Sequence, residues 1–165
     1  EHYHDEINNP KLNIDENCIL MIRGCGPIGY PGAAEVVNMQ PPDYLLKKGV
    51  TALPCLGDGR QSGTSESASI LNVSPEAAAG GKLSIIENND MIKVDLINKR
   101  VDVILENSVI EERMKKSKFE FPGNQTPWQE IAREYTGQLS DGACIDTKEN
   151  YFDVANTKGI PRDNH

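Results

Sequence analysis

Short apolar runs of four to seven residues recur along this chain of 165 residues, separated by polar and glycine-rich segments. Apolar runs of that length are typical of buried strands. They predict five strands, at residues 18–22, 50–56, 83–86, 91–97 and 101–105. Asn98 and Lys99 form a two-residue turn before the last strand, so the last two strands are expected to pair as a hairpin.

Helix signals lie between these runs, at residues 33–39, 41–49, 74–79, 108–116 and 126–138. The clearest start is at Thr126, which has the N-cap residue type, with Pro127 at the first helical position and Gln129 at the third. A second capping box, Ser108-x-x-Glu111, predicts a charged helix that ends near Lys116.

Short strands, a hairpin and separated helices together predict an α+β fold, mainly β, with strands curled into a small barrel flanked by helices. The regular alternation of strand and helix that builds a doubly wound sheet is missing. The length fits a single domain over residues 1–165, in which residues 150–165 form an irregular tail without periodicity.

The charge balance disfavours nucleic acid as a partner. Lys and Arg number 17 against 25 Asp and Glu, which gives a formal net charge of −8, and the basic residues are scattered. No run approaches 18 apolar residues, so we expect no membrane span. The first ten residues lack the pattern of a signal peptide, which favours a cytoplasmic protein.

Four cysteines, Cys18, Cys25, Cys55 and Cys144, are spread over the chain without a C-x-x-C pair. Zinc and iron–sulfur sites usually draw two ligands from one short loop, so a metal site built from these residues is disfavoured. Free thiols in a reducing compartment are the better interpretation, although counting alone leaves disulfides open.

Two glycine-rich segments, residues 24–32 and 57–65, each follow a predicted strand. Backbone N–H groups in such loops can point outward, where they bind anions or stabilise oxyanions. Neither loop is a P-loop, and Pro27 blocks the helix start that a dinucleotide site needs after G-x-G-x-x-G. Ser62 lacks the glycine two positions earlier that a nucleophile elbow requires. Local pattern thus leaves both a structural turn and a ligand-binding loop open.

Longer motifs favour the second interpretation. Ile22-Arg-Gly-Cys-Gly-Pro-Ile-Gly-Tyr-Pro-Gly-Ala-Ala-Glu35, then Leu56-Gly-Asp-Gly-Arg-Gln-Ser-Gly-Thr-Ser65 and Ser74-Pro-Glu-Ala-Ala78, resembles the C-terminal part of the dihydroxy-acid dehydratase and phosphogluconate dehydratase family. The segments 125–131 and 159–162 are most similar to the sugar-acid branch, the L-arabinonate and D-xylonate dehydratases. The resemblance covers nearly the whole chain and implies one C-terminal domain of a longer enzyme, of the swivelling β/β/α type.

The resemblance also implies a reaction and its residues. These hydro-lyases remove water from a 2,3-dihydroxy carboxylate to leave a 2-keto-3-deoxy acid, with an iron–sulfur cluster as Lewis acid and Mg²⁺ on the substrate carboxylate. Ser62 matches the base that takes the proton from C2, and Glu35 matches a Mg²⁺ ligand, for which a carboxylate is well suited. Thr64 matches a residue that positions substrate, and Arg60 adds positive charge for substrate binding.

The family's cluster cysteines, its other Mg²⁺ ligands and its modified lysine belong to an N-terminal domain that this chain lacks. No iron–sulfur ligand is therefore expected here, and the chain alone should bind no cluster and be inactive. The implied partners are that N-terminal domain and a small-molecule sugar acid or dihydroxy acid, in a homo-oligomer of the full-length enzyme.

Three other interpretations stay open. The substrate could be a branched-chain dihydroxy acid of amino-acid biosynthesis. The loops could instead form a non-catalytic module that binds an anionic metabolite, or the domain could serve only as a scaffold that covers a partner domain. A scaffold would tolerate substitution of Ser62, whereas an enzyme would not.

Overall fold

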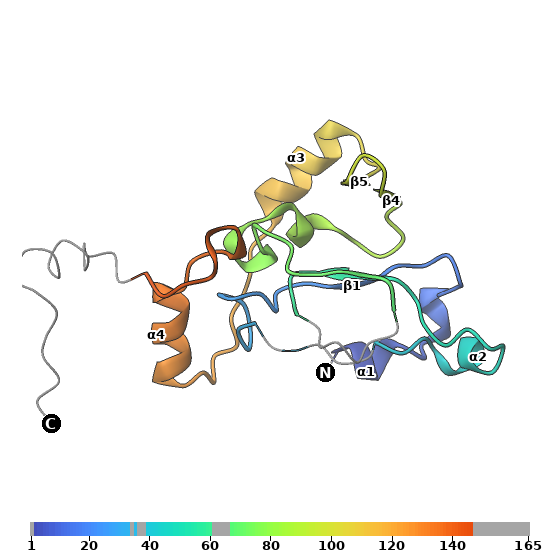
Figure 1. Ribbon diagram of the computed structural model, residues 1–165, viewed down its shortest axis with the longest axis horizontal. Helices are drawn as coiled ribbons and strands as arrows, with labels where there is room; N and C mark the ends of the chain where they lie inside the picture. Colours follow the sequence, from blue (N-terminus) through green and yellow to red (C-terminus); the bar gives the residue numbers. More distant parts are fainter. Residues whose placement is uncertain (1, 34, 36–38, 61–66, 147–165) are drawn as a thin grey trace, which may run out of the picture.

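A computed structural model describes residues 2–33, 35, 39–60 and 67–146 of the chain. Helices and short strands alternate irregularly along these residues (Figure 1). In chain order the elements are α1 (His2–Glu6), η1 (Pro10–Leu12), β1 (Leu20–Ile22), α2 (Asp43–Leu46), β2 (Cys55–Gly57), β3 (Ser69–Ile70), η2 (Ala77–Ala79), η3 (Lys82–Ile85), β4 (Ile92–Asp95), β5 (Arg100–Val103), α3 (Asn107–Lys116), α4 (Pro127–Tyr135) and η4 (Leu139–Asp141), where η marks a 3₁₀ helix.

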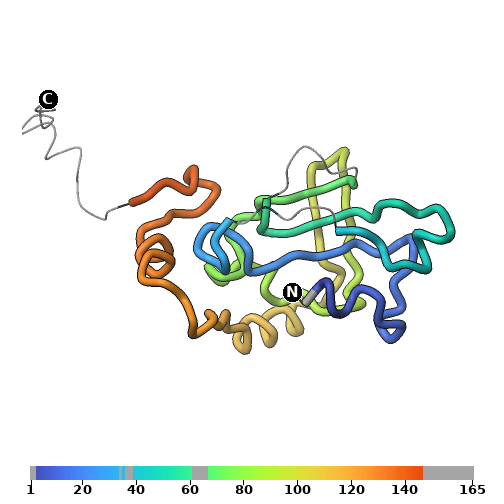
Figure 2. Tube along the Cα trace, turned by 90° about the horizontal axis from the view of Figure 1, so that it is seen from below, coloured from blue at the N-terminus to red at the C-terminus, as the bar shows by residue number. Residues whose placement is uncertain are grey.

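The main sheet has three parallel strands in the order β1-β2-β3. Its register places Leu20 beside Cys55 and Ile22 beside Gly57, and the three strands run side by side in Figure 2. The second sheet is the antiparallel hairpin of β4 and β5, which confirms the predicted pairing. The predicted two-residue turn is wrong, because residues 96–99 separate the paired Asp95 and Arg100. Figure 1 shows this hairpin and α3 on one side of the main sheet and α1 on the other.

The central strand β2 joins two clusters of buried side chains. Cys55 and Leu56 point to opposite faces of the sheet because side chains alternate along a strand. One cluster contains Leu20, Met39, Leu45, Leu53 and Cys55. The other contains Leu56, Ala77 and Leu83. Both loops that follow β1 and β2 therefore start from well-packed strand ends.

The fold is thus a small mixed α/β domain with short sheets. Among the described residues neither sheet closes on itself, so the predicted barrel is not confirmed. No helix in that part of the chain is long and apolar enough to cross a bilayer. The predicted helix at 33–39 and the tail at 150–165 fall largely or wholly outside the described residues.

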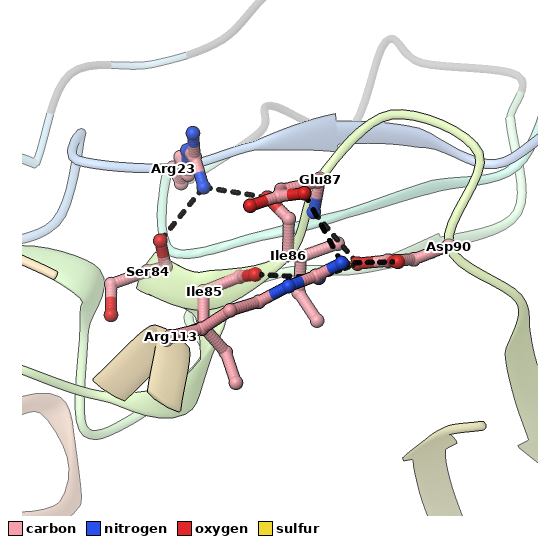
Figure 3. Close-up of polar contacts among 7 residues, drawn as sticks. All are labelled: Arg23, Ser84, Ile85, Ile86, Glu87, Asp90 and Arg113. Carbon is pink, nitrogen blue, oxygen red and sulfur yellow. Dashed lines mark hydrogen bonds and ion pairs between the residues drawn. The ribbon is translucent and has the colours of Figure 1, made fainter. Parts of the chain in front are cut away.

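The predicted strand at 83–86 is wrong, because Lys82–Ile85 form the 3₁₀ helix η3 and Ile86 is its C-cap. Its carbonyl groups are satisfied by arginine side chains rather than by a neighbouring strand (Figure 3). Arg23, at the end of β1, donates from Nη1 to the carbonyl oxygens of Ser84 at 2.8 Å and Ile86 at 2.6 Å. Arg113 of α3 donates to the carbonyl oxygen of Ile85 at 3.1 Å.

The two predicted capping boxes have different outcomes. At α4 the box is confirmed, since Thr126 Oγ1 accepts the Gln129 N–H and Gln129 Oε1 accepts the Thr126 N–H. This helix ends at Tyr135, earlier than predicted. At α3 the box is wrong, because the helix starts one residue early and its N-cap is Glu106, which makes no capping hydrogen bond with its side chain.

Candidate functional site

The candidate site is formed by two loops at the carboxyl ends of neighbouring parallel strands. The first loop, residues 24–33, follows β1, and the second loop, residues 57–65, begins at the end of β2. Residues 61–65 of the second loop lie outside the described residues, and these include Ser62 and Thr64. Such strand ends are the usual place for ligand sites in open parallel sheets.

Asp58, in the second loop, holds the start of the first loop. Its side chain is buried, at 1% exposure. Asp58 Oδ2 accepts the backbone N–H of Gly24 at 2.9 Å, and Oδ1 accepts that of Cys25 at 3.0 Å. Oδ2 also accepts the N–H of Ala77 at 2.9 Å. One carboxylate therefore connects both loops and the first residue of η2.

Glu76 holds the next part of the first loop in the same way. It is fully buried, at 0% exposure. Its Oε1 accepts the N–H of Ile28 at 3.0 Å, and its Oε2 accepts that of Gly29 at 3.0 Å. Gln138 Nε2 donates to Glu76 Oε1 at 2.8 Å, while Gln138 Oε1 accepts the Glu76 N–H at 3.0 Å.

The first loop needs glycine where it wraps around Glu76. A Cβ atom added at Gly26 would lie 2.3 Å from Glu76 Oε2. One added at Gly29 would lie 2.3 Å from the carbonyl oxygen of Gly24. Both distances are far inside van der Waals contact, so the glycines allow the close approach of backbone to a carboxylate.

These contacts correct the expectation that N–H groups of the first loop point outward. The N–H groups of Gly24, Cys25, Ile28 and Gly29 point inward, to carboxylates of the protein itself. The loop does bind anions, but they are its own side chains. Those four donors are consequently not offered to an external anion.

The structure brings Glu35 and Arg60, two of the residues predicted from the sequence, close together. Their backbones pair in an isolated parallel bridge. Arg60 Nη1 lies 3.9 Å from Glu35 Oε2, and Arg60 Nε donates to the carbonyl oxygen of Ala33 at 2.8 Å. The Arg60 side chain is 56% exposed and that of Glu35 31% exposed. Both polar ends can therefore reach a ligand at the surface.

A groove of about 380 Å³ lies between the first loop and α4. Its lining includes Pro31, Ala33, Trp128 and Arg133. Arg133 fixes α4 against the loop, because its Nε donates to the carbonyl oxygen of Ile28 at 3.2 Å. The guanidinium of Arg133 also stacks 3.7 Å above the ring of Phe121.

The described side chains fit a Mg²⁺ ligand better than a cluster ligand. Glu35 offers a partly exposed carboxylate, and its separation from Arg60 is too long for a hydrogen bond. By contrast, burial and then the Asp58 charge raise the pKa of the Cys25 thiol, and burial raises the pKa of Cys55. A cluster needs thiolates, which a raised thiol pKa disfavours. Among the described residues no group of three His, Cys, Asp or Glu side chains could hold a metal ion of either kind.

Sequence reasoning missed Asp58, Glu76 and Gln138. A signal was available for the first two. Asp58 stands between two glycines directly after the apolar run at 50–56, and Glu76 directly follows a proline at the predicted helix start. Gln138 gave no signal, since it lies past the end of a helix and 62 positions from its partner.

Comparison with known proteins defines the class. A family model described as dihydroxy-acid/6-phosphogluconate dehydratase C-terminal matches residues 1–143. The chain belongs to this family.

Two of the similar proteins are sugar-acid dehydratases by name, and a third is a dihydroxy-acid dehydratase. The chain is 53% identical over 163 residues to D-xylonate dehydratase of Caulobacter vibrioides, which covers 99% of the chain and 27% of that protein. It is 44% identical over 112 residues to L-arabinonate dehydratase of Rhizobium leguminosarum, covering 68% of the chain and 19% of that protein. Dihydroxy-acid dehydratase of Methanococcus maripaludis is 43% identical over 104 residues, 62% of the chain and 18% of that protein. The chain thus spans about a quarter or less of the length of these relatives.

Proposed function

We propose that the chain is the C-terminal catalytic domain of a longer hydro-lyase that dehydrates a sugar acid, a 2,3-dihydroxy carboxylate, to a 2-keto-3-deoxy acid. The observation that carries this proposal is the meeting of Glu35 with Arg60, one from each glycine-rich motif, at the carboxyl ends of two parallel strands. In the reaction C2 loses a proton and C3 loses its hydroxyl, which together make one water. The enol that remains becomes the 2-keto group.

Ser62 is proposed as the base that takes the C2 proton. It follows Arg60 by two residues, and two residues of extended chain span at most about 7 Å. A serine hydroxyl is a weak base at its ordinary pKa and needs activation by its surroundings. The positive charge of Arg60 favours the deprotonated oxygen and the substrate carboxylate, and Thr64 is proposed to position the substrate.

Glu35 is proposed to hold Mg²⁺ through its carboxylate. A bound Mg²⁺ would supply Lewis-acid stabilisation for the negative charge that forms on the substrate. One carboxylate gives one ligand, so the other ligands and the iron–sulfur cluster are assigned to an N-terminal portion of the enzyme. We further propose that the full-length enzyme is a cytoplasmic homo-oligomer, that the domain completes the swivelling β/β/α arrangement, and that the chain alone is inactive.

The sugar-acid substrate is favoured by the D-xylonate dehydratase relative, which matches over nearly the whole chain. A branched-chain dihydroxy acid is the second candidate, because a dihydroxy-acid dehydratase matches over 62% of the chain. A non-catalytic anion-binding module is less well supported, since four N–H groups of the first loop already bind Asp58 and Glu76.

The test is steady-state dehydration by the complete enzyme, followed as keto acid formed. Ser62→Ala should lower the rate ~10²–10⁴-fold, which is the usual contribution of a positioned proton acceptor. Glu35→Gln should raise the Mg²⁺ concentration needed for half-maximal rate. Ser108→Ala and Glu134→Gln, at exposed helix positions, are the matched controls. A Ser62→Ala enzyme with more than about a tenth of the original rate would overturn the role of the serine.

A further inference from the structure

Two buried carboxylates have no place in the chemistry proposed above. Asp58 and Glu76 together accept six N–H groups, of which five belong to the backbone and one to Gln138. Within the described part of the chain, no ion pair reaches either residue. Removing a carboxylate from water is costly, and the three hydrogen bonds that each one accepts offset only part of that cost. Such a costly arrangement calls for a reason beyond packing.

The six contacts form a continuous connection through the site. Asp58 begins the second loop and binds the first loop at Gly24 and Cys25. It also binds Ala77, whose neighbour Glu76 binds the first loop again, at Ile28 and Gly29. The first loop is therefore held by carboxylate oxygens at both ends of its tight turn.

This connection continues to the residues proposed for chemistry. The Ala33 N–H donates to the carbonyl oxygen of Gly26 at 2.8 Å, inside the stretch that Asp58 and Glu76 hold. Arg60, two residues after Asp58, donates to the Ala33 carbonyl oxygen and pairs with the backbone of Glu35. The position of Glu35 relative to the second loop thus depends on where the first loop is held.

We propose that Asp58 and Glu76 are positioning residues, which fix the first loop so that Glu35 stands in register with the second loop. This proposal rests on the proposed function of Glu35 and Ser62. An ionised carboxylate suits the task because it only accepts hydrogen bonds, and every group that faces it donates. An amide of the same shape would put its own N–H₂ against one of those donors.

The test uses Asp58→Asn and Glu76→Gln in the complete enzyme. Asp90→Asn is the matched control: Asp90 is also a mostly buried carboxylate that accepts a backbone N–H, from Glu87 at 2.8 Å, but it lies near the hairpin. Hydrogen exchange is read by mass spectrometry in peptides that contain residues 24–29 and 84–90. The Mg²⁺ concentration for half-maximal rate and kcat are measured beside thermal melts.

Asp58→Asn and Glu76→Gln should each speed exchange at residues 24–29 by about tenfold or more, since local opening sets the exchange rate. They should also raise the Mg²⁺ requirement and lower kcat by up to ~10²-fold, because a misplacement of about 1 Å has that effect. Asp90→Asn should speed exchange at residues 84–90 and leave the Mg²⁺ requirement unchanged. If Asp90→Asn lowered kcat as much as Asp58→Asn or Glu76→Gln at an equal loss of melting temperature, the roles of Asp58 and Glu76 would be structural only.

Gln138→Ala keeps the proposal testable if Asp58→Asn does not fold. It removes one donor to the Glu76 carboxylate and the acceptor of the Glu76 N–H, and it changes no residue of either loop, so it should produce the same changes on a smaller scale. Unchanged exchange at residues 24–29 in this variant would overturn the positioning role of Glu76. A Glu35→Gln enzyme with an unaltered Mg²⁺ requirement would instead overturn the proposed function, and the exchange results would stand without it.

Discussion

The loop region and the hairpin region both use carboxylates, yet they use them in different ways. In the loop region Asp58 and Glu76 are buried and accept N–H groups that carry no net charge. In the hairpin region, which comprises β4, β5, α3 and the turn at 87–90, Asp90 pairs with the guanidinium of Arg113 at 2.5 Å. Glu87 pairs with the same guanidinium at 3.1 Å and is largely exposed.

The difference shows what each arrangement can control. Hydrogen bonds from backbone N–H groups fix the path of the chain itself, and the low local dielectric makes them strong. The ion pairs of Arg113 hold side chains rather than backbone, and salt screens the exposed one, with Glu87. A precise backbone path is needed where Glu35 and Arg60 must meet.

The largest effect is expected at the closest contact of the loop region. Gly26→Ala would place a methyl group 2.3 Å from Glu76 Oε2, so the loop or the carboxylate must move. The free energy of unfolding of the chain should fall by about 1–3 kcal/mol, the usual cost of overpacking. Urea unfolding measures it. Gly123→Ala is the control, because nothing lies within 4 Å of an added Cβ there, and it should cost under ~0.5 kcal/mol. Equal effects at both positions would contradict a tightly packed loop.

Local signals in the sequence predicted part of this fold. The hairpin follows from alternating apolar residues around a short turn, and the start of α4 from Thr126 and Gln129, three positions apart. Residues 83–86 could not be assigned in this way, because a short apolar run suits a strand and a helix equally. Arg23 and Arg113 donate hydrogen bonds to carbonyl oxygens of this segment in its helical form, and both arginines are distant from it in the sequence.

In the candidate site, too, local motifs could be recognised from the sequence, whereas contacts between distant residues could not. Glu35 and Arg60 could be predicted from motifs, and the structure brings them together. The inward direction of the loop N–H groups could not, because Asp58 is 34 positions from Gly24 and Glu76 is 47 from Gly29. Glycine-rich sequence signals that a backbone can approach an anion closely, but it does not say whether that anion is a ligand or a side chain.

A smaller, pH-dependent effect is expected from the hairpin region. Burial alone would raise the pKa of Asp90, but the hydrogen bonds from Arg113 and the Glu87 N–H and the Arg113 charge outweigh it and hold that pKa below its usual value. The stabilisation is therefore complete above the unfolded pKa of about 3.9 and is lost as the pH falls through the lower folded pKa.

Asp90→Asn should remove that dependence. At neutral pH the variant should lose about 1 kcal/mol, because hydrogen bonds to a charged group contribute more than those to a neutral one. Its melting temperature should also fall less steeply than that of the original chain between about pH 5 and pH 2. Melts across this range provide the measurement. Parallel curves for the two proteins would show that Asp90 is not the group that titrates.

The smallest effect is expected at the exposed pair of α3, where Lys116 Nζ lies 2.5 Å from Glu112 Oε1 one helical turn away. Both side chains are mostly exposed, so water and salt weaken the attraction. Glu112→Gln should lower the free energy of unfolding only slightly in low salt, and less in 1 M salt, where the screening length falls to about 3 Å. Glu111→Gln is the matched control, since Glu111 forms no ion pair among the described residues and should show no salt-dependent difference. The same salt series on Gly26→Ala should leave its loss of stability nearly constant, because overpacking is not electrostatic. If the Gly26→Ala loss also shrank with salt, the loop region would depend on screened charge, and the contrast between the two regions would fail.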